Sequence, residues 1–163
     1  MGYTQHWKFR DSKAPVEFEN GAEKFANAAY LGVKLCGKVR EMGIKICGGD
    51  GYGNPAFSRG KVVFNGSAEN GEDYETFSIV PTDGEYDFCK TNEKPYNLLV
   101  CLMLLAFKHY FGDDFTYWSD GITKEDYENR ANNEYWKRIG FEPKGASKDW
   151  ELAYKVWGEV VGE

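Results

Sequence analysis

Residues 97–107 read NLLVCLMLLAF, and this apolar run decides how the rest of the chain is arranged. Just before it, residues 88–97 read FCKTNEKPYN, where Pro95 suits the first turn of a helix because no N–H is needed there. Gly112 provides a stop, and basic residues precede it near the negative end of the helix dipole. The pattern predicts a helix from about Pro95 to Gly112. Because this helix is apolar nearly all round, we expect other elements to cover it on several sides.

The N-terminal residues 1–9, MGYTQHWKF, alternate in the way of a half-buried strand. One face of this strand would carry Tyr3, Gln5, Trp7 and Phe9, and the other Thr4, His6 and Lys8. Further short strands are predicted at 43–47, 61–66, 74–80 and 115–121. Most of these strands are expected to form an antiparallel set.

Further helices are predicted around the central one. The first follows a capping-box pattern at Asn20 and Glu23 and runs to about Glu41. A second begins near Thr123, where another capping-box pattern precedes an apolar stripe. The last follows Ser147, with its inward face formed by Trp150, Ala153, Val156, Trp157 and Val160.

The chain has 163 residues, enough to bury a hydrophobic core in one domain but short for two. The order of the elements predicts an α+β fold in a single domain over residues 1–163. Its mainly antiparallel sheet of about five strands would pack against the buried central helix and the further helices. The aromatic C-terminal stripe is interpreted as core, with a protein interface as the alternative.

Charge and cysteine spacing exclude several functional classes. A formal net charge of −6 disfavours a general binder of nucleic acid or anionic membranes, because such binding relies on lysine and arginine. The 4 cysteines lie far apart and only 2 histidines are present, so neither a metal site nor a cofactor is predicted. No apolar leader opens the chain, and no apolar run reaches the roughly 20 residues that a membrane span needs. A cytoplasmic protein with reduced thiols is expected.

The polar segment before the apolar run is the first candidate site. A helix N-terminus offers unpaired N–H groups and partial positive charge, so Lys90, Thr91 and Lys94 could hold a phosphate or carboxylate there. Tyr96 and the aromatic residues of the first strand could stack on a base. The alternative is that Thr91 or Asn92 simply caps the helix while the lysines are solvated.

Cys89 offers an enzymatic alternative. A nearby helix N-terminus and Lys90 would favour its thiolate, which is how nucleophilic cysteines are activated. A base would have to come from His6 or His109, the only histidines in the chain. A small buried side chain is the simpler interpretation of Cys89, and no catalytic residue is assigned.

Four short motifs occur in a recognisable order along the chain. They are GYT with Trp7 near the N-terminus, FNG at 64–66, FCKT followed by KPY within 88–96, and SDG at 119–121. In this order and spacing they resemble a family of small uncharacterised proteins from phages, prophages and bacteria. Members of that family typically begin MGYTHYW and carry FCKT-x-x-KPY before an apolar helix. The resemblance covers the chain from residue 1 to about residue 121.

The resemblance implies that the polar members of these motifs belong to one ligand-binding site. That site would contain Thr4, Lys90, Thr91, Lys94, Tyr96, Ser119 and Asp120. It forms only if the first strand, the start of the central helix and the end of the final strand are neighbours in space. The chain departs from the family at Gln5 and His6, where the family has a histidine followed by an aromatic residue, so no role for that histidine is carried over.

The resemblance also implies a mobile-element setting, in which small acidic proteins often inhibit host defence. The leading hypothesis is a non-enzymatic phage or prophage counter-defence protein that sequesters a small anionic nucleotide signal in the host cytoplasm. The lysines would bind its phosphate, and Tyr3, Trp7 or Tyr96 would stack on its base.

Two alternatives remain open at this point. One is an anti-CRISPR inhibitor whose acidic surface occupies the basic nucleic-acid channel of a Cas nuclease. The other is a small nucleotide-processing enzyme that uses Cys89 or Asp120. A homo-oligomer is also left open, and no membrane partner is expected.

Overall fold

The central helix is surrounded by other elements, as its apolar sequence requires. A computed structural model describes residues 3–120 and 148–162, which pack around a shared hydrophobic core. At its centre lies α2 (Asn97–Phe111), and most of its side chains are buried. The predicted central helix is therefore confirmed, although it begins at Asn97 rather than near Pro95.

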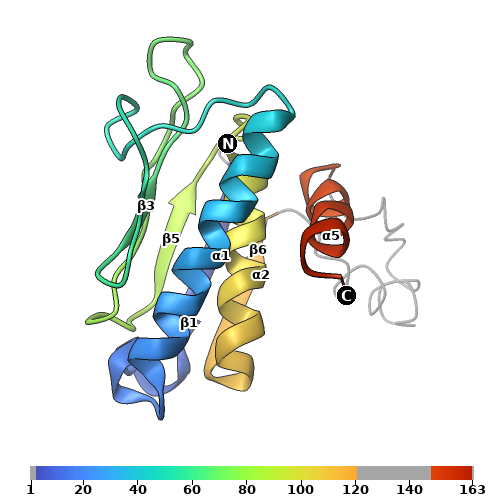
Figure 1. Cartoon of the computed structure of the whole chain (residues 1–163). Coiled ribbons are helices and arrows are strands. Elements are labelled where there is room, and N and C mark those ends of the chain that lie inside the picture. The colour runs from blue at the N-terminus through green and yellow to red at the C-terminus, as the bar shows by residue number, and fades with distance from the viewer. Residues whose placement is uncertain (1–2, 121–147, 163) are drawn as a thin grey trace, which may run out of the picture.

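Two helices pack against α2, and both were predicted from the sequence. They are α1 (Gly21–Glu41) and α5 (Lys148–Val161). Figure 1 shows α1 beside α2 and α5 against the other side of α2. Trp150 and Trp157 of α5 are buried, so the C-terminal aromatic stripe is core. The helix predicted near Thr123 lies outside the described residues.

The start of α1 differs in detail from the prediction. Asn20 adopts a left-handed conformation with φ of 55° and makes no side-chain capping hydrogen bond. A capping contact occurs earlier, where the Ala14 N–H donates to Glu17 Oε2 at 2.9 Å at the start of the short 3₁₀ helix η2 (Pro15–Glu17). Further 3₁₀ turns are η1 (Arg10–Ser12) and η3 (Gly112–Asp114), which follow β1 and α2.

The first antiparallel sheet has the strand order β5-β1-β6 and lies on one side of α2. It consists of β1 (Thr4–Phe9), β5 (Asp87–Lys90) and β6 (Phe115–Ser119). The predicted alternation of β1 is confirmed, because Gln5, Trp7 and Phe9 are buried while Thr4, His6 and Lys8 are not. Central placement suits β1, since both of its edges are paired and its inner side chains join the core.

The second antiparallel sheet is smaller and has the order β2-β3-β4. It consists of β2 (Ala56–Phe57), β3 (Val62–Phe64) and β4 (Phe77–Ile79). The strands predicted at 61–66 and 74–80 are therefore present but shorter. The strand predicted at 43–47 is wrong, because only Cys47 forms an isolated bridge, with Asn65.

These elements form a mixed α+β fold, as predicted, but its strands are divided between two sheets rather than one. A glycine allows a close approach between α1 and its neighbours. A Cβ added at Gly32 would lie 2.7 Å from the Phe57 ring and 2.9 Å from Met103 Sδ. Among the described residues, no helix combines the length and apolarity that crossing a membrane requires.

Candidate functional site

The segment expected at the mouth of the central helix has a different structure. Residues Asp87–Lys90 form β5 and pair with β1. Lys90 is therefore the last residue of a strand and does not lie at a helix N-terminus. Strand pairing prevails here because β1 and the residue before it supply backbone partners, including the Tyr3 carbonyl that accepts from the Thr91 N–H at 2.9 Å. The simple cap interpretation is also wrong, because no side chain caps α2.

Three of the expected site residues face the core. Trp7, Thr91 and Tyr96 are all buried. The Thr91 hydroxyl donates to Asn97 Oδ1 at 2.8 Å, and the Tyr96 hydroxyl donates to the Glu75 carbonyl at 2.6 Å. In this arrangement their polar atoms bind other parts of the chain, and neither aromatic ring offers an open surface for stacking.

Two further residues make contacts at the edges of the fold. Ser119 is half-buried, and its Oγ accepts a hydrogen bond from Trp150 Nε1 at 3.2 Å. Lys94 precedes α2, and its Nζ donates to the Gly71 carbonyl at 3.1 Å. Both residues therefore connect segments that are distant in sequence.

The remaining three residues come together on the outer face of the first sheet. Thr4 lies directly opposite Lys90 in the pairing of β1 with β5. On the other side, the Asp120 N–H donates to the Thr4 carbonyl at 3.0 Å, and the Thr4 N–H donates to Asp120 Oδ2 at 3.2 Å. The first strand and the end of the final strand are therefore neighbours, as a site shared between them requires.

Next to Thr4, Lys90 and Asp120 lies a cluster of aromatic rings that the sequence reasoning missed. We call it the aromatic face, and it consists of His6, Tyr86, Phe88 and Trp118. His6 lies opposite both Phe88 and Trp118, so one row of the ladder crosses all three strands. The His6 and Trp118 rings are nearly parallel, with centroids 5.4 Å apart.

The aromatic face is open to solvent. Tyr86 is 48% exposed, Phe88 47% and Trp118 38%. A single exposed aromatic residue is common on protein surfaces, but a contiguous group indicates a binding surface. Base stacking and protein contact are two recognised uses of such groups.

Hydrogen bonds hold the imidazole of His6 in the middle of this face. Its Nδ1 lies 2.8 Å from the Tyr86 hydroxyl, and its Nε2 lies 3.3 Å from Asp120 Oδ1. Both contacts are satisfied by a neutral ring that donates from Nε2 to the carboxylate and accepts from the hydroxyl at Nδ1. Asp120 therefore positions His6 as well as joining β6 to β1.

Lysines lie in the rows on both sides of the aromatic row. Lys90 is opposite Thr4 on one side, and Lys8 is opposite Thr116 on the other. Residues two positions apart on a strand are separated by about 7 Å, so each ammonium can reach a ligand stacked on the rings. Within the described part of the chain, neither lysine side chain has a hydrogen bond or an ion pair.

The thiol of Cys89 is poorly suited to nucleophilic chemistry. It is buried on the inner face of β5, and its Sγ donates to the Glu75 carbonyl at 3.3 Å. Desolvation by burial is the main cause that raises its pKa to about 12. A thiolate is therefore disfavoured, which is the opposite of what an activated cysteine requires.

Comparisons with protein-family models, with curated proteins and with solved structures give no match to this chain. The resemblance to the phage and prophage family therefore stays a prediction, as do the setting and the partners that it implies. What the site can bind follows from its own chemistry. Exposed aromatic rings between two lysines suit a planar ligand that carries negative charge.

Proposed function

We propose that the protein is a non-enzymatic binder of a small anionic nucleotide, which it holds on the aromatic face. The observation that supports this proposal is the exposed row formed by Phe88, His6 and Trp118, with Lys8 and Lys90 in the neighbouring rows. A base would stack on the rings, and a phosphate would lie near one or both ammonium groups. The ligand class is the one expected from the sequence. The stacking residues differ, because they come from the outer face of the first sheet instead of from Tyr3, Trp7 or Tyr96.

Known magnitudes indicate how much each part of this arrangement would contribute to binding. Stacking of one base on an aromatic side chain contributes about 1–3 kcal/mol. Each of the two lysines adds a smaller, salt-dependent attraction of roughly 0.2–1 kcal/mol. The net charge of −6 opposes long polyanions more than a small ligand, because repulsion accumulates with every additional phosphate.

The biological role that we propose is sequestration of a nucleotide immune signal by a phage or prophage counter-defence protein in the host cytoplasm. This part of the proposal is supported by the motif resemblance. The contacts of the nearby ionisable groups support a protein that binds its ligand without catalysing a reaction. Asp120 is engaged by Thr4 and His6, and the thiol of Cys89 is buried with a raised pKa.

The second candidate is inhibition of a Cas-type nuclease, and an acidic recess beside the first sheet favours it. Asp83, Glu85 and Asp87 line this recess together with Trp7. Burial, and to a lesser degree the charges of Asp83 and Glu75, raise the pKa of Asp87, whereas its hydrogen bond to the Phe88 N–H lowers it. Such a recess would attract basic side chains from a nucleic-acid channel.

The first prediction is that Trp118→Ala abolishes most nucleotide binding. Isothermal titration calorimetry with mononucleotides, cyclic mononucleotides and cyclic dinucleotides should find a ligand for the wild-type protein. Loss of the Trp118 stacking surface should lower the affinity for that ligand by roughly five- to one-hundredfold. Lys90→Gln should lower this affinity by roughly two- to fivefold, with a smaller effect at high salt.

Matched controls locate the effect. Tyr52 is 60% exposed in a loop outside the aromatic face, so Tyr52→Ala should bind like the wild type. Lys61→Gln makes the same charge change as Lys90→Gln at an exposed position beside β3. Absence of any nucleotide ligand would contradict the proposal, and ligand turnover in the same assay would contradict its non-enzymatic part. Inhibition of a nuclease that survives Trp118→Ala and weakens with salt would favour the acidic surface instead.

A further inference from the structure

A second candidate site lies at the C-terminal end of α1, beside the loop that follows this helix. Two adjoining cavities of about 450 Å³ and about 270 Å³ share Arg40 and Asn54 in their linings. We call them together the Arg40 groove. The larger cavity extends along Ile46 and Cys47, and the smaller one extends along Val33 and Phe57. Their volumes are of the size that small organic ligands occupy.

The charge of the groove is opposite to that of the chain as a whole. The chain has 26 acidic residues against 20 lysines and arginines. Yet among the residues that the structure describes, no aspartate or glutamate lines either cavity. Arg40 and Lys45 are the charged residues in these linings. Within the described residues, neither of them forms an ion pair. The groove is therefore a local cationic region on an acidic protein.

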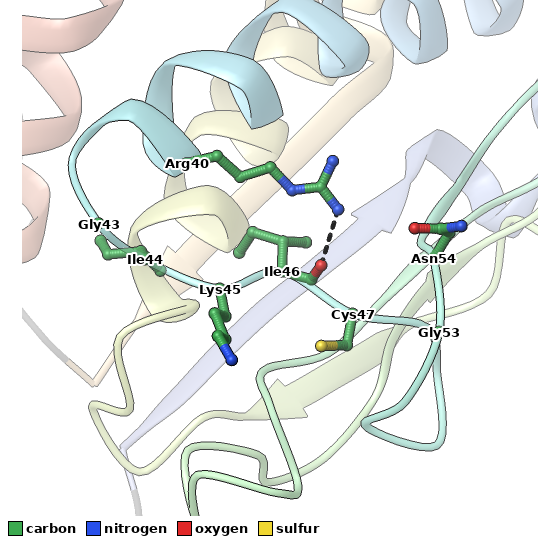
Figure 2. A pocket seen from close by; sticks show the side chains of 8 residues that line it. All are labelled: Arg40, Gly43, Ile44, Lys45, Ile46, Cys47, Gly53 and Asn54. Atoms are coloured by element: carbon green, nitrogen blue, oxygen red, sulfur yellow. Dashed lines mark hydrogen bonds between the residues drawn. The ribbon is translucent and has the colours of Figure 1, made fainter.

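Arg40 is held in place but keeps most of its donors. One terminal nitrogen donates to the Ile46 carbonyl at 2.8 Å, and Figure 2 shows this bond joining the end of α1 to the following loop. A guanidinium has five N–H donors in a planar fork, so several remain for a ligand. In the same view the guanidinium extends toward Asn54, whereas Lys45 points away from it. Arg40 is thus the anchor, and Lys45 contributes only at longer range.

Two carbonyls at the C-terminal end of α1 are already paired within the chain. The carbonyls of Val39 and Arg40 accept hydrogen bonds from the N–H groups of Met42 and Gly43, at 3.1 Å and 3.0 Å. These last-turn acceptors are therefore already paired within the helix end. Beyond the guanidinium, the wall of the smaller cavity is mostly apolar, with Val33, Pro55 and Phe57.

We propose that the Arg40 groove binds a small organic anion, with its carboxylate or phosphate at Arg40 and its apolar part along Val33 and Phe57. This site is separate from the aromatic face, and its ligand does not depend on the proposed nucleotide binding. The ligand class follows from the contents of the groove. A bidentate guanidinium suits a planar or tetrahedral oxyanion, and the apolar wall removes hydrocarbon from water.

The test uses benzoate and phenyl phosphate as probes, with benzamide as an uncharged counterpart of benzoate. Calorimetry on the full chain should give saturable binding of at least one anion with a Kd at or below about 1 mM, and none of the amide. Bound probe should also slow alkylation of Cys47 by iodoacetamide, because this thiol lines the groove. The Trp118→Ala variant should bind these probes as well as the wild type does, which separates this site from the aromatic face.

Variants then assign the anchor. Arg40→Gln should weaken anion binding at least about tenfold, and Arg40→Lys should weaken it less, because the charge remains without the planar fork. Lys34→Gln removes one positive charge, as Arg40→Gln does, at an exposed position on α1 outside the groove, and it should have no effect. Equal binding of benzamide, equal loss in Lys34→Gln, or no saturable anion binding by the wild type would each overturn the proposal.

Discussion

The role inferred for Cys89 changes once its spatial neighbours are known. In sequence it stands beside Lys90 and before a helix, which are the surroundings of an activated thiol. In the structure it points from β5 into the core, and burial raises the pKa of its thiol to about 12. Strand geometry decides this outcome, because successive residues of a strand point to opposite faces. Lys90 and Cys89 therefore lie on opposite sides of the sheet.

We predict that Cys47 is the cysteine most rapidly alkylated by iodoacetamide in the folded protein at pH 8. Burial raises the pKa of the thiols of Cys36, Cys89 and Cys101, and it also blocks access to them, whereas Cys47 is only partly buried. Peptide mass spectrometry should find these three at least about tenfold slower than Cys47. All four should react at similar rates in urea. Labelling of Cys89 as fast as that of Cys47 would restore the nucleophile hypothesis.

At the scale of elements, a buried amide joins the C-terminal helix to the rest of the fold. Asn97 Nδ2 donates to Asp149 Oδ2 at 2.7 Å, while Asn97 Oδ1 accepts from Gln5 Nε2 at 3.0 Å and from the Thr91 hydroxyl at 2.8 Å. One side chain thus connects α2 with β1, with the segment after β5 and with α5. Apolar stripes indicate that α5 packs inward, and this network specifies its position.

The Asp149 carboxyl makes this contact dependent on pH. Desolvation by burial is the largest cause that raises its pKa above the ordinary value of 3.8, and the Asn97 hydrogen bond and Lys148 only partly oppose it. The folded state therefore binds the proton more tightly than the unfolded state does. It follows that the contribution of Asp149 to stability is largest at low pH and decreases as the pH rises from about 3.8 through the folded pKa.

We predict that Asp149→Asn and Asp149→Ala have different effects on the free energy of unfolding. Asparagine keeps an acceptor for Asn97 and removes the desolvated charge, so stability at pH 7 should change by less than about 1 kcal/mol. Alanine leaves the Asn97 amide without this partner and should cost about 1–3 kcal/mol. Urea unfolding at pH 4.5 and pH 7 measures both effects, and the Asp149 contribution to pH dependence should vanish in Asp149→Asn. Equal stabilities of the two variants would show that the contact contributes nothing.

At the scale of the whole molecule, Glu75 joins the segment before β4 to the first sheet. Its backbone N–H donates to the Lys90 carbonyl at 3.1 Å, and its Oε1 accepts from the Lys90 N–H at 2.7 Å. Its carbonyl accepts from the Tyr96 hydroxyl at 2.6 Å, beside the thiol of Cys89. Tyr96 therefore connects the start of α2 with both sheets, which explains why this polar ring is fully buried.

We predict that Tyr96→Phe destabilises the whole fold by about 0.5–1.5 kcal/mol while leaving nucleotide affinity unchanged. The ring still fills its place in the core, and only the hydroxyl contact with Glu75 is lost. Urea unfolding followed by far-UV circular dichroism measures stability, and calorimetry measures binding under native conditions. A loss of binding in the folded variant would return Tyr96 to the ligand site. Trp118→Ala should show the reverse pattern, with binding reduced more than stability.

The helices and the inner face of β1 could be predicted because each depends on a local period. The apolar run 97–107 specifies a buried helix, and the alternation in β1 separates inward from outward side chains. Strand β5 could not be recognised in this way. Within Asp87–Lys90 the large apolar side chain of Phe88 points outward, so hydrophobicity does not reveal the inner face. Its pairing with β1 joins residues 80 or more positions apart, and local sequence does not encode that partner.

Short-range patterns in this chain are enough to establish the central helix, its covering helices and the outward position of Thr4, His6 and Lys8. They specify these features because helix and strand periodicity acts over neighbouring residues. The composition of the aromatic face was decided only by tertiary structure. Cross-strand register brings His6, Phe88 and Trp118 into one row, and their exposure depends on the absence of a covering element among the described residues. Register and cover are properties of the assembled sheet, so the stacking surface exists only once the chain has folded.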